Sequence, residues 1–343
     1  MKIIDSMITY ENVLNRKVRT IPFTPSEISE LRKERILITG AGGSIGSRIA
    51  IALSKIGGVN SLATDRDESA LHSLSLKLTS SALFEGNNFL LLDIRDSIGA
   101  ERIAKEFKPT VIIHAAALKH LSVLEKQPRE ALLTNVYGTL NMLEIAQKVG
   151  SKKFVNISTD KAASPVSVLG RSKFLAELLT ASFKSNIGRD FTSVRFGNVF
   201  GSRGSVIETF VDQIERGMPI TVTHADVKRY FMHADEAAFL TLKSMFVTDG
   251  DIHLFDMGDP ILIVDLIEQL QKLLGGRSNL IFTGLRGGEK LNDDHFGGLE
   301  ERVVSIPNLV ESSRHTTSLE ENESLVADII ARNDSAYFKY IEG

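Results

Sequence analysis

Residues 36–46 read Ile-Leu-Ile-Thr-Gly-Ala-Gly-Gly-Ser-Ile-Gly, and a helical pattern continues to about residue 56. The stretch has the order of a buried strand, a glycine-rich turn and a helix. In such a unit the backbone amides of the turn and the helix N-terminus face the pyrophosphate of a dinucleotide. Asp65 follows at the end of the next predicted strand, where a carboxylate binds the adenosine ribose. The stretch predicts dinucleotide binding, and a turn shaped by glycine for backbone reasons alone is the alternative.

Apolar segments alternate with amphipathic helical patterns from Arg35 to Arg195. Strict alternation of this kind predicts a parallel sheet with helices on both faces. The expected fold class is α/β, a doubly wound parallel Rossmann sheet with a smaller C-terminal substrate-binding region. The predicted strands are 36–39, 61–64, 89–92, 111–114, 154–158 and 192–195, and the predicted helices are 45–56, 67–78, 97–107, 128–149 and 169–185.

The pattern changes after Arg195, where glycines, short strands such as 220–223 and less regular helices follow. A helix near 235–246 is expected to return to the main domain, and 319–332 is the last segment with clear helical periodicity. Thr24-Pro25-Ser26-Glu27 has the pattern of a helix start. The expected parts are an N-terminal arm, 1–34, a dinucleotide-binding domain, 35–195 plus about 229–256, and a substrate-binding region, about 196–228 plus 257–343.

The composition is that of an ordinary globular protein, with 43% hydrophobic and 24% charged residues. A formal net charge of -3 gives no reason to expect nucleic acid or an anionic membrane as a partner. The chain has no cysteine, which excludes disulfides and thiolate metal sites and is consistent with a cytoplasmic enzyme. No signal peptide and no apolar run of membrane-spanning length occurs, so we expect a soluble protein without membrane insertion.

The cofactor is expected to be NAD or NADP. The Asp65 carboxylate repels a 2′-phosphate and favours NAD, whereas Arg66 beside it could bind that phosphate. Asp93-Ile94 could flank the adenine or start the next helix, and the Ala115–Ala117 run allows a close approach to the cofactor or simply tight packing. The predicted cofactor-binding residues are Gly40, Gly42, Gly43, Ser44, Ile45, Gly46, Asp65, Arg66, Asp93, Ile94, Ala115, Ala116, Ala117, Asn135 and Lys173.

Residues 158–161, Ser-Thr-Asp-Lys, place a carboxyl and an amine side by side where a predicted strand ends. The carboxyl ends of parallel strands face the ligand in open α/β sheets, so Asp160 and Lys161 are candidates for an acid and a base. Lys173 follows in the next predicted helix. An exposed Asp–Lys ion pair and a solvated helix lysine are the ordinary alternatives.

Seven blocks in this order resemble the polysaccharide-biosynthesis branch of the extended short-chain dehydrogenases/reductases, over roughly residues 12–295. Its best-known members are UDP-N-acetylglucosamine 4,6-dehydratases, many of them C5-inverting. Longer members carry a membrane-spanning N-terminal domain, and residues 11–34 resemble the connector that follows it. The blocks are Gly40–Ser47, His114–His120, Thr134–Val136, Ser158–Lys161, Arg195–Ser205, Arg229–Met232 and Thr283–Leu291.

The resemblance implies a dehydration in which bound nicotinamide takes hydride from C4 of a hexose and later returns it to C6. A base removes the acidified C5 proton, and an acid protonates the departing C6 hydroxyl. The resemblance assigns Lys161 as base and Asp160 as acid, with the Thr159 hydroxyl near the C4 oxygen and Lys173 on the nicotinamide ribose. We expect enclosure to lower the pKa of Lys161 and raise that of Asp160.

Many short-chain dehydrogenases have a catalytic tyrosine four residues before the helix lysine, and this chain has Leu169 there. Dehydratases of the branch carry tyrosine or methionine at this position, so the change affects turnover more than fold. Leucine has no acid or base function, and ordinary core packing is its alternative role. The C4 hydroxyl must then lose its proton to Lys161, Asp160 or a water.

The substrate implied by the resemblance is a UDP-sugar. Arginine binds phosphate oxygens with two parallel hydrogen bonds, so Arg229 and Arg286 are the expected diphosphate ligands. The Ile220–Val222 backbone is expected to read uracil, while Asn292–Asp294 departs from the usual continuation of the family. The predicted substrate-binding residues are Lys119, His120, Asn198, Ser202, Arg203, Ser205, Thr221, Arg229, Arg286 and Glu289.

Three functions stay open. A UDP-N-acetylhexosamine 4,6-dehydratase leads, followed by another nucleotide-sugar enzyme of this fold, such as a C4 epimerase or 4-ketoreductase, and by a nucleotide-binding protein without turnover. Homo-oligomerisation through the helices 128–149 and 169–185 is expected from the resemblance. No metal site is expected, because the histidines have no metal-ligand spacing; these are His114, His224, His233 and His295.

Overall fold

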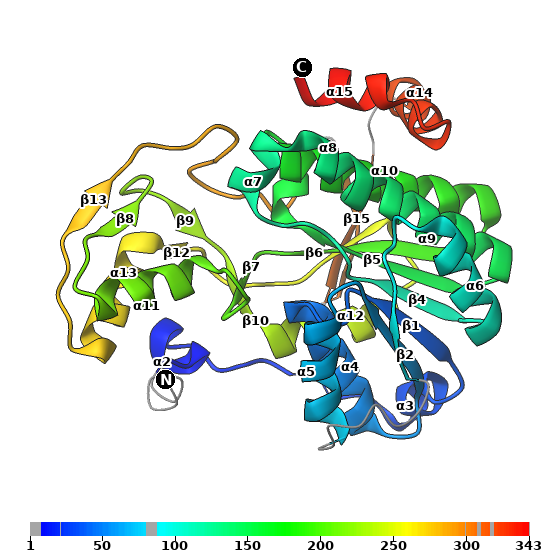
Figure 1. The fold of residues 1–343 in the computed structure, drawn as a ribbon, viewed down its shortest axis with the longest axis horizontal. Coiled ribbons are helices and arrows are strands. Elements are labelled where there is room, and N and C mark those ends of the chain that lie inside the picture. The colour runs from blue at the N-terminus through cyan, green and yellow to red at the C-terminus, as the bar shows by residue number, and fades with distance from the viewer. Residues whose placement is uncertain are drawn as a thin grey trace.

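A nine-stranded sheet forms the centre of the main domain (Figure 1). The computed structural model describes residues 8–20, 22–79, 88–298, 300–306, 310–315 and 319–342. The strand order is β14-β15-β11-β6-β5-β4-β1-β2-β3, and the segment from β11 to β3 is parallel. The parallel strands are β1 (Arg35–Thr39), β2 (Asn60–Asp65), β3 (Phe89–Leu91), β4 (Val111–His114), β5 (Lys153–Thr159), β6 (Asp190–Phe196) and β11 (Ile252–Leu254).

Helices cover both faces of this sheet, as the alternation predicted. In β1, Ile36 and Ile38 pack into one buried cluster and Leu37 into the other, because successive side chains of a strand point to opposite faces. The predicted doubly wound Rossmann fold is confirmed. Helices α4 (Ser44–Ile56), α5 (Glu68–Thr79) and α12 (Ala234–Ser244) cover one face, and α6 (Ser97–Phe107), α9 (Tyr137–Val149) and α10 (Val168–Ile187) cover the other.

A smaller region with its own apolar core lies beside the carboxyl ends of the strands, on the left in Figure 1. Strand β7 (Asn198–Phe200) pairs with β10 (Phe231–His233) where the chain passes between the two regions. The N-terminal segment contributes Tyr10 and Val13 to the smaller core. Its other elements are α2 (Tyr10–Leu14), α11 (Val206–Glu215), β8 (Ile220–Val222), β9 (Lys228–Arg229), β12 (Ile261–Leu262), α13 (Ile263–Leu274) and β13 (Leu280–Phe282).

The predicted helix start at Thr24 is confirmed. The Thr24 hydroxyl accepts from the Glu27 backbone N–H, and the Glu27 carboxylate accepts from the Thr24 N–H, which forms a capping box for α3 (Pro25–Leu31). No helix in the described part of the chain has the length and apolar character needed to cross a membrane.

The C-terminal segment differs from the expected division, which placed 257–343 in the substrate-binding region. Strands β15 (Val310–His315) and β14 (Glu300–Ile306) extend the main sheet beyond β11: β15 is antiparallel to β11, and β14 is antiparallel to β15. Helices α14 (Leu319–Ile330) and α15 (Asp334–Glu342) pack on the main domain, where Tyr337 joins the same buried cluster as Leu140. Apolar residues thus hold this segment on the outer side of α9 and α10 (Figure 1).

The helix predicted at 128–149 is three consecutive pieces. They are α8 (Pro128–Ala131), a π-helical turn η1 (Leu132–Val136) and α9. A π-helical turn inserts one residue into the ladder, and such insertions are frequent at functional sites. It places Asn135 toward the site described below.

Candidate active site

The glycine-rich turn after β1 lies against the backbone that follows β4. Gly40 has φ +66°, and a Cβ at this position would lie 2.6 Å from Ala116 Cα. A Cβ at Gly46 would lie 2.2 Å from the Gly40 carbonyl oxygen. Both glycines are therefore required, because the backbone of Ala116 and of Gly40 lies too close to leave room for a side chain. The amides of Ala41, Gly42 and Gly43 donate within the protein, so the part of this turn that suits an anion is the N-terminus of α4, where Gly43 is the N-cap and no side chain caps the helix.

Asp65 lies at the end of β2 and is tied to this turn. Its Oδ2 accepts a hydrogen bond from Gly42 N at 2.9 Å, and its Oδ1 accepts one from Asp67 N at 2.9 Å. Arg66 is exposed beside it. The charge of Asp65 is thus fixed where the adenosine ribose is expected.

Asp93 and Ile94 are engaged in other contacts. The Asp93 carboxylate accepts hydrogen bonds from Arg95 Nη2 at 2.6 Å and from Arg95 Nε at 3.0 Å, and these bonds hold its pKa below the usual range. The Ile94 side chain is buried against Gly138, so closely that a Cβ at Gly138 would lie 2.5 Å from it. The Asp96 side chain, instead of Asp93, caps α6. A role for Asp93 and Ile94 at the adenine stays a prediction.

Asn135 holds the backbone that passes under the site. Its Oδ1 accepts from Leu118 N at 2.8 Å and its Nδ2 donates to Leu118 O at 3.1 Å and to Ser172 Oγ at 3.0 Å. All these partners belong to the protein, so Asn135 positions the segment after Ala117 instead of offering a free group. Its predicted contact with the cofactor stays a prediction.

Lys173 projects from α10 and is 4% exposed. Burial lowers its pKa to about 8, although the nearby Glu177 acts in the opposite direction. No hydrogen bond from its amine occurs among the described residues. A buried amine in this condition is a candidate ligand for a cofactor hydroxyl. His114 nearby stays neutral, since burial and Lys173 lower its pKa to about 3.

Asp160 and Lys161 form the start of a short 3₁₀ turn, η2 (Asp160–Ala162), directly after β5. Asp160 is 1% exposed, and its Oδ1 accepts hydrogen bonds from Thr159 Oγ1 at 2.9 Å and Lys161 Nζ at 3.1 Å. Its other oxygen, Oδ2, has no hydrogen-bond partner in the described residues, and neither has the buried Ser158 hydroxyl. The two unpaired polar groups mark a place for a polar ligand.

The electrostatics of this pair agree with the expectation for Asp160 and disagree with it for Lys161. Burial raises the pKa of Asp160, and the carboxylate of Asp293 adds to this, while Lys161 opposes it. Burial lowers the pKa of Lys161, but the carboxylates of Asp160 and Asp293 outweigh this and raise it. In this conformation Asp160 is suited to donate a proton, and Lys161 is held as an ammonium ion.

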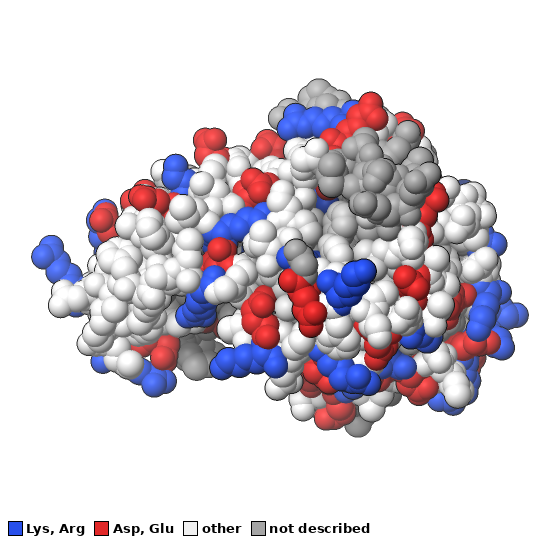
Figure 2. All heavy atoms as spheres, turned by 90° about the horizontal axis from the view of Figure 1, so that it is seen from above, with Lys and Arg blue, Asp and Glu red and all other residues white. Residues whose placement is uncertain are grey.

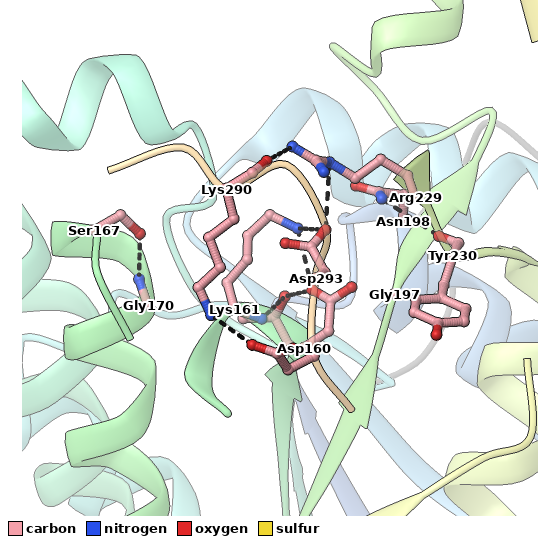
Figure 3. Close-up of polar contacts among 12 residues, drawn as sticks. Asp160, Lys161, Ser167, Gly170, Gly197, Asn198, Arg229, Tyr230, Lys290 and Asp293 are labelled. Atoms are coloured by element: carbon pink, nitrogen blue, oxygen red, sulfur yellow. Dashed lines mark hydrogen bonds and ion pairs between the residues drawn. The ribbon is translucent and has the colours of Figure 1, made fainter. Parts of the chain in front are cut away.

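Asp293 was not among the residues predicted from the sequence. Its Oδ2 lies 3.2 Å from Lys161 Nζ and 3.3 Å from Arg229 Nε, and its side chain is 3% exposed (Figure 3). The departure at Asn292–Asp294 from the resembled pattern was the only signal in the sequence. That signal could not show that the carboxylate reaches the Asp160–Lys161 pair, 132 residues earlier.

The expected diphosphate ligands differ in their surroundings. The Nη1 and Nη2 groups of Arg229 donate to the carbonyls of Leu291 and Lys290, and Nη2 also pairs with Glu289, whereas Nε faces Asp293. Glu289 also accepts from Thr223 Oγ1 at 2.9 Å. Arg286 is exposed on the same segment.

The turn after β7 reaches back to the glycine-rich turn. The Arg203 backbone N–H donates to Ser44 Oγ at 3.2 Å, and Lys119 Nζ donates to Ser202 Oγ at 3.2 Å. The His120 ring packs against Gly204, so closely that a Cβ at Gly204 would lie 2.7 Å from the ring. These predicted residues are therefore brought together between the two regions.

Three other predicted substrate residues have local structural contacts. Ser205 caps the N-terminus of α11, Asn198 Nδ2 donates to the Tyr230 carbonyl at 3.3 Å, and the Thr221 hydroxyl accepts from Gln213 at 3.1 Å. Their contact with a substrate stays a prediction.

Leu169 occupies a small apolar cluster with Leu124, Ala131 and Val168. Core packing accounts for it, and it brings no hydroxyl to Lys161.

Among the residues that the structure describes, no three histidine or acidic side chains are arranged to hold a metal ion. On the face seen in Figure 2, acidic and basic side chains are interspersed.

Comparison with known sequences identifies one family over most of the chain. The profile of the family described as "Polysaccharide biosynthesis protein" matches residues 36–304. The capsular polysaccharide biosynthesis protein CapD of Staphylococcus aureus is 40% identical over 274 residues, which are 77% of this chain and 45% of CapD. The chain therefore spans less than half the length of this curated relative.

Two solved structures show the same fold. The protein Pen from Bacillus thuringiensis superposes with a TM-score of 0.72 at 28% identity, covering 87% of this chain and 98% of Pen. The dTDP-glucose 4,6-dehydratase DesIV from Streptomyces venezuelae, solved with NAD bound, has a TM-score of 0.66 at 21% identity. That superposition covers 77% of this chain and 88% of DesIV.

Proposed function

This chain belongs to the polysaccharide biosynthesis protein family, and from this premise we propose that it is a nucleotide-sugar 4,6-dehydratase using NAD. The proposed substrate is a UDP-N-acetylhexosamine, UDP-N-acetylglucosamine first, and the proposed product is a 4-keto-6-deoxy sugar nucleotide with inverted C5. The buried Asp160 carboxyl beside Lys161, with one oxygen and the Ser158 hydroxyl unpaired, is the observation that carries the proposal.

The residues present fit a dinucleotide. A Cβ would fill the close approach at Gly40 and Gly46, and the N-terminus of α4, which has no side-chain cap, would bind the pyrophosphate. The Lys173 amine is buried without an acceptor in the described residues, as a ligand of the nicotinamide ribose would be. The fixed charge of Asp65 favours NAD over NADP.

Bound NAD supplies oxidation at C4 and returns the hydride to C6. Lys161 removes the C5 proton, which the C4 ketone has made acidic. Asp160, which holds its proton because burial raises its pKa, protonates the departing C6 hydroxyl. The Ser158 and Thr159 hydroxyls orient the C4 oxygen. Leu169 offers no proton acceptor and Lys161 is needed for the C5 proton, so a water takes the C4 hydroxyl proton.

The proposal is tested by incubating the protein and NAD with UDP-N-acetylglucosamine in heavy water and analysing the nucleotide sugars by mass spectrometry and NMR. Loss of water with deuterium at C5 supports a 4,6-dehydratase. A C4 epimer formed without loss of water identifies an epimerase of the same fold. Recovery of unchanged substrate from a protein that binds NAD and UDP contradicts an enzyme acting on this sugar.

A further inference from the structure

One carboxylate closes the space between Lys161 and Arg229 (Figure 3). The single oxygen Oδ2 of Asp293 lies 3.2 Å from the amine and 3.3 Å from the guanidinium. The cavity lined by these residues and by Gly288–Lys290 has a volume of about 20 Å³. That is room for about one water molecule and excludes a sugar or a phosphate.

The segment that carries Asp293 packs closely against neighbouring residues and also borders a second cavity. It is bracketed by Gly287-Gly288 and Gly297-Gly298. A Cβ on Gly288, which has φ +76°, would lie 2.7 Å from Ser167 Cβ, and a Cβ on Gly297 would lie 2.2 Å from the Ala163 carbonyl oxygen. On its other side Asp293 lines a cavity of about 420 Å³, so its side chain has space to turn away from Lys161 and Arg229.

The cations that Asp293 pairs are the two that the proposed reaction needs. Arg229 is a predicted diphosphate ligand, and Lys161 is the proposed base. The Asp293 carboxylate contacts Arg229 at Nε alone, and a phosphate oxygen would compete with it for that N–H, because both are anionic acceptors.

We propose that Asp293 is a counter-ion displaced by the substrate: its carboxylate holds Arg229 and Lys161 until the diphosphate of a nucleotide sugar takes its place at Arg229. The inference rests on the proposed function in assigning a nucleotide sugar to this site. Displacement removes one of the two carboxylates that raise the pKa of Lys161. Burial, which favours the neutral amine, is then opposed by Asp160 alone. Substrate binding therefore shifts Lys161 from an ammonium ion toward a neutral amine that can act as a base. Asp293 acts as a positioning residue.

The test measures binding of inorganic pyrophosphate and of UDP to the full chain by calorimetry. Asp293→Asn keeps the shape of the side chain and removes its charge. We expect both ligands to bind about tenfold more tightly to this variant, at the low end of measured couplings between close charge pairs. Asp293→Ser is expected to do the same and serves if the amide variant does not fold. In the Asp293→Asn background, Arg229→Gln should remove the gain.

Asp294→Asn is the matched control, because it removes the same charge from the same segment. Asp294 pairs with Lys290 at 3.2 Å and its side chain is 52% exposed. We expect it to change pyrophosphate affinity by less than about twofold, as for an exposed pair. An unchanged affinity in both Asp293 variants overturns the inference, and so does an equal gain in Asp294→Asn.

These outcomes are independent of turnover. If pyrophosphate binds more tightly to Asp293→Asn and UDP-N-acetylglucosamine is not converted, the counter-ion role stands and the proposed reaction fails. If the sugar is converted and pyrophosphate binds no more tightly to Asp293→Asn, the proposed reaction stands and the counter-ion role fails. A purely structural ion pair would lower the melting temperature of Asp293→Asn without tightening the binding of an anion.

Discussion

Glu300, the first residue of β14, places its Oε1 2.7 Å from Arg195 Nη2 in the buried part of β6. Arg195 is 1% exposed and also pairs with Glu177 of α10 at 2.6 Å. The ion pair therefore connects the C-terminal strands with the strand and helix that flank the site. It adds to the backbone pairing of β15 with β11 in holding this segment on the main sheet.

The first prediction concerns this ion pair. Glu300→Ala should lower the free energy of unfolding by about 3 kcal/mol, because it leaves a buried guanidinium with one counter-ion. Glu301→Ala, an exposed neighbour, should change it by less than about 0.5 kcal/mol. Urea unfolding of both variants is the measurement, and equal stabilities would show that Glu300 does not hold β14.

The second prediction concerns Lys173. Lys173→Met should weaken NAD binding by more than about tenfold, since a hydrogen bond to a charged group contributes about 1.5–3 kcal/mol. Lys105→Met on α6, whose side chain is 66% exposed, should leave NAD binding unchanged. Calorimetric titration with NAD decides the point. If Lys173→Met binds NAD like the wild type, its amine does not contact the cofactor.

The third prediction concerns cofactor selection. Asp65→Ser should reduce the ratio of NAD to NADP affinity by at least about tenfold, because the carboxylate that repels a 2′-phosphate and binds the ribose is lost. Glu68→Gln, an exposed change of the same charge nearby, should leave the ratio unchanged. An unaltered ratio in Asp65→Ser would assign the selection to other residues.

The fourth prediction concerns the pH dependence of stability. Burial raises the pKa of Asp160, so above its unfolded pKa the native state binds more protons than the unfolded state, and stability falls as pH rises through the folded pKa. Asp160→Asn carries no titrating group and should therefore lose turnover and gain stability relative to the wild type as pH rises. Melting temperatures from pH 4 to 9 test this. A constant difference across that range contradicts the raised pKa.

Much of the fold could be predicted because it depends on local patterns. Alternating apolar segments located every strand of the parallel sheet up to β6, and Thr24–Glu27 located a helix start. The C-terminal strands could not be located, because their place depends on Arg195 finding Glu300 more than one hundred residues later. The π-helical turn at Leu132–Val136 was also missed, since one inserted residue leaves the helical periodicity almost intact.

The sequence analysis predicted the catalytic candidates of the site but missed Asp293, which pairs with one of them. The pair Asp160–Lys161 follows β5, and Lys173 lies in the next helix, α10. Local sequence patterns predict both elements, and the structure brings the three side chains to one end of the sheet. The direction of the Lys161 pKa shift was wrong, because Asp293 comes from a distant segment and adds a second carboxylate. The covering of the outer side of α9 and α10 by α14 and α15 was also unforeseen. Homo-oligomerisation through those helices stays a prediction.

The most direct test of the central claim is deuterium incorporation by Lys161→Met. The variant is compared with the wild type and with Lys290→Met, a neighbouring lysine whose amine pairs with Asp294. With UDP-N-acetylglucosamine in heavy water, wild type and Lys290→Met should form a dehydrated product labelled at C5. Lys161→Met should form none while still binding NAD. Wild-type incorporation of deuterium by Lys161→Met would contradict the assignment of Lys161 as the base.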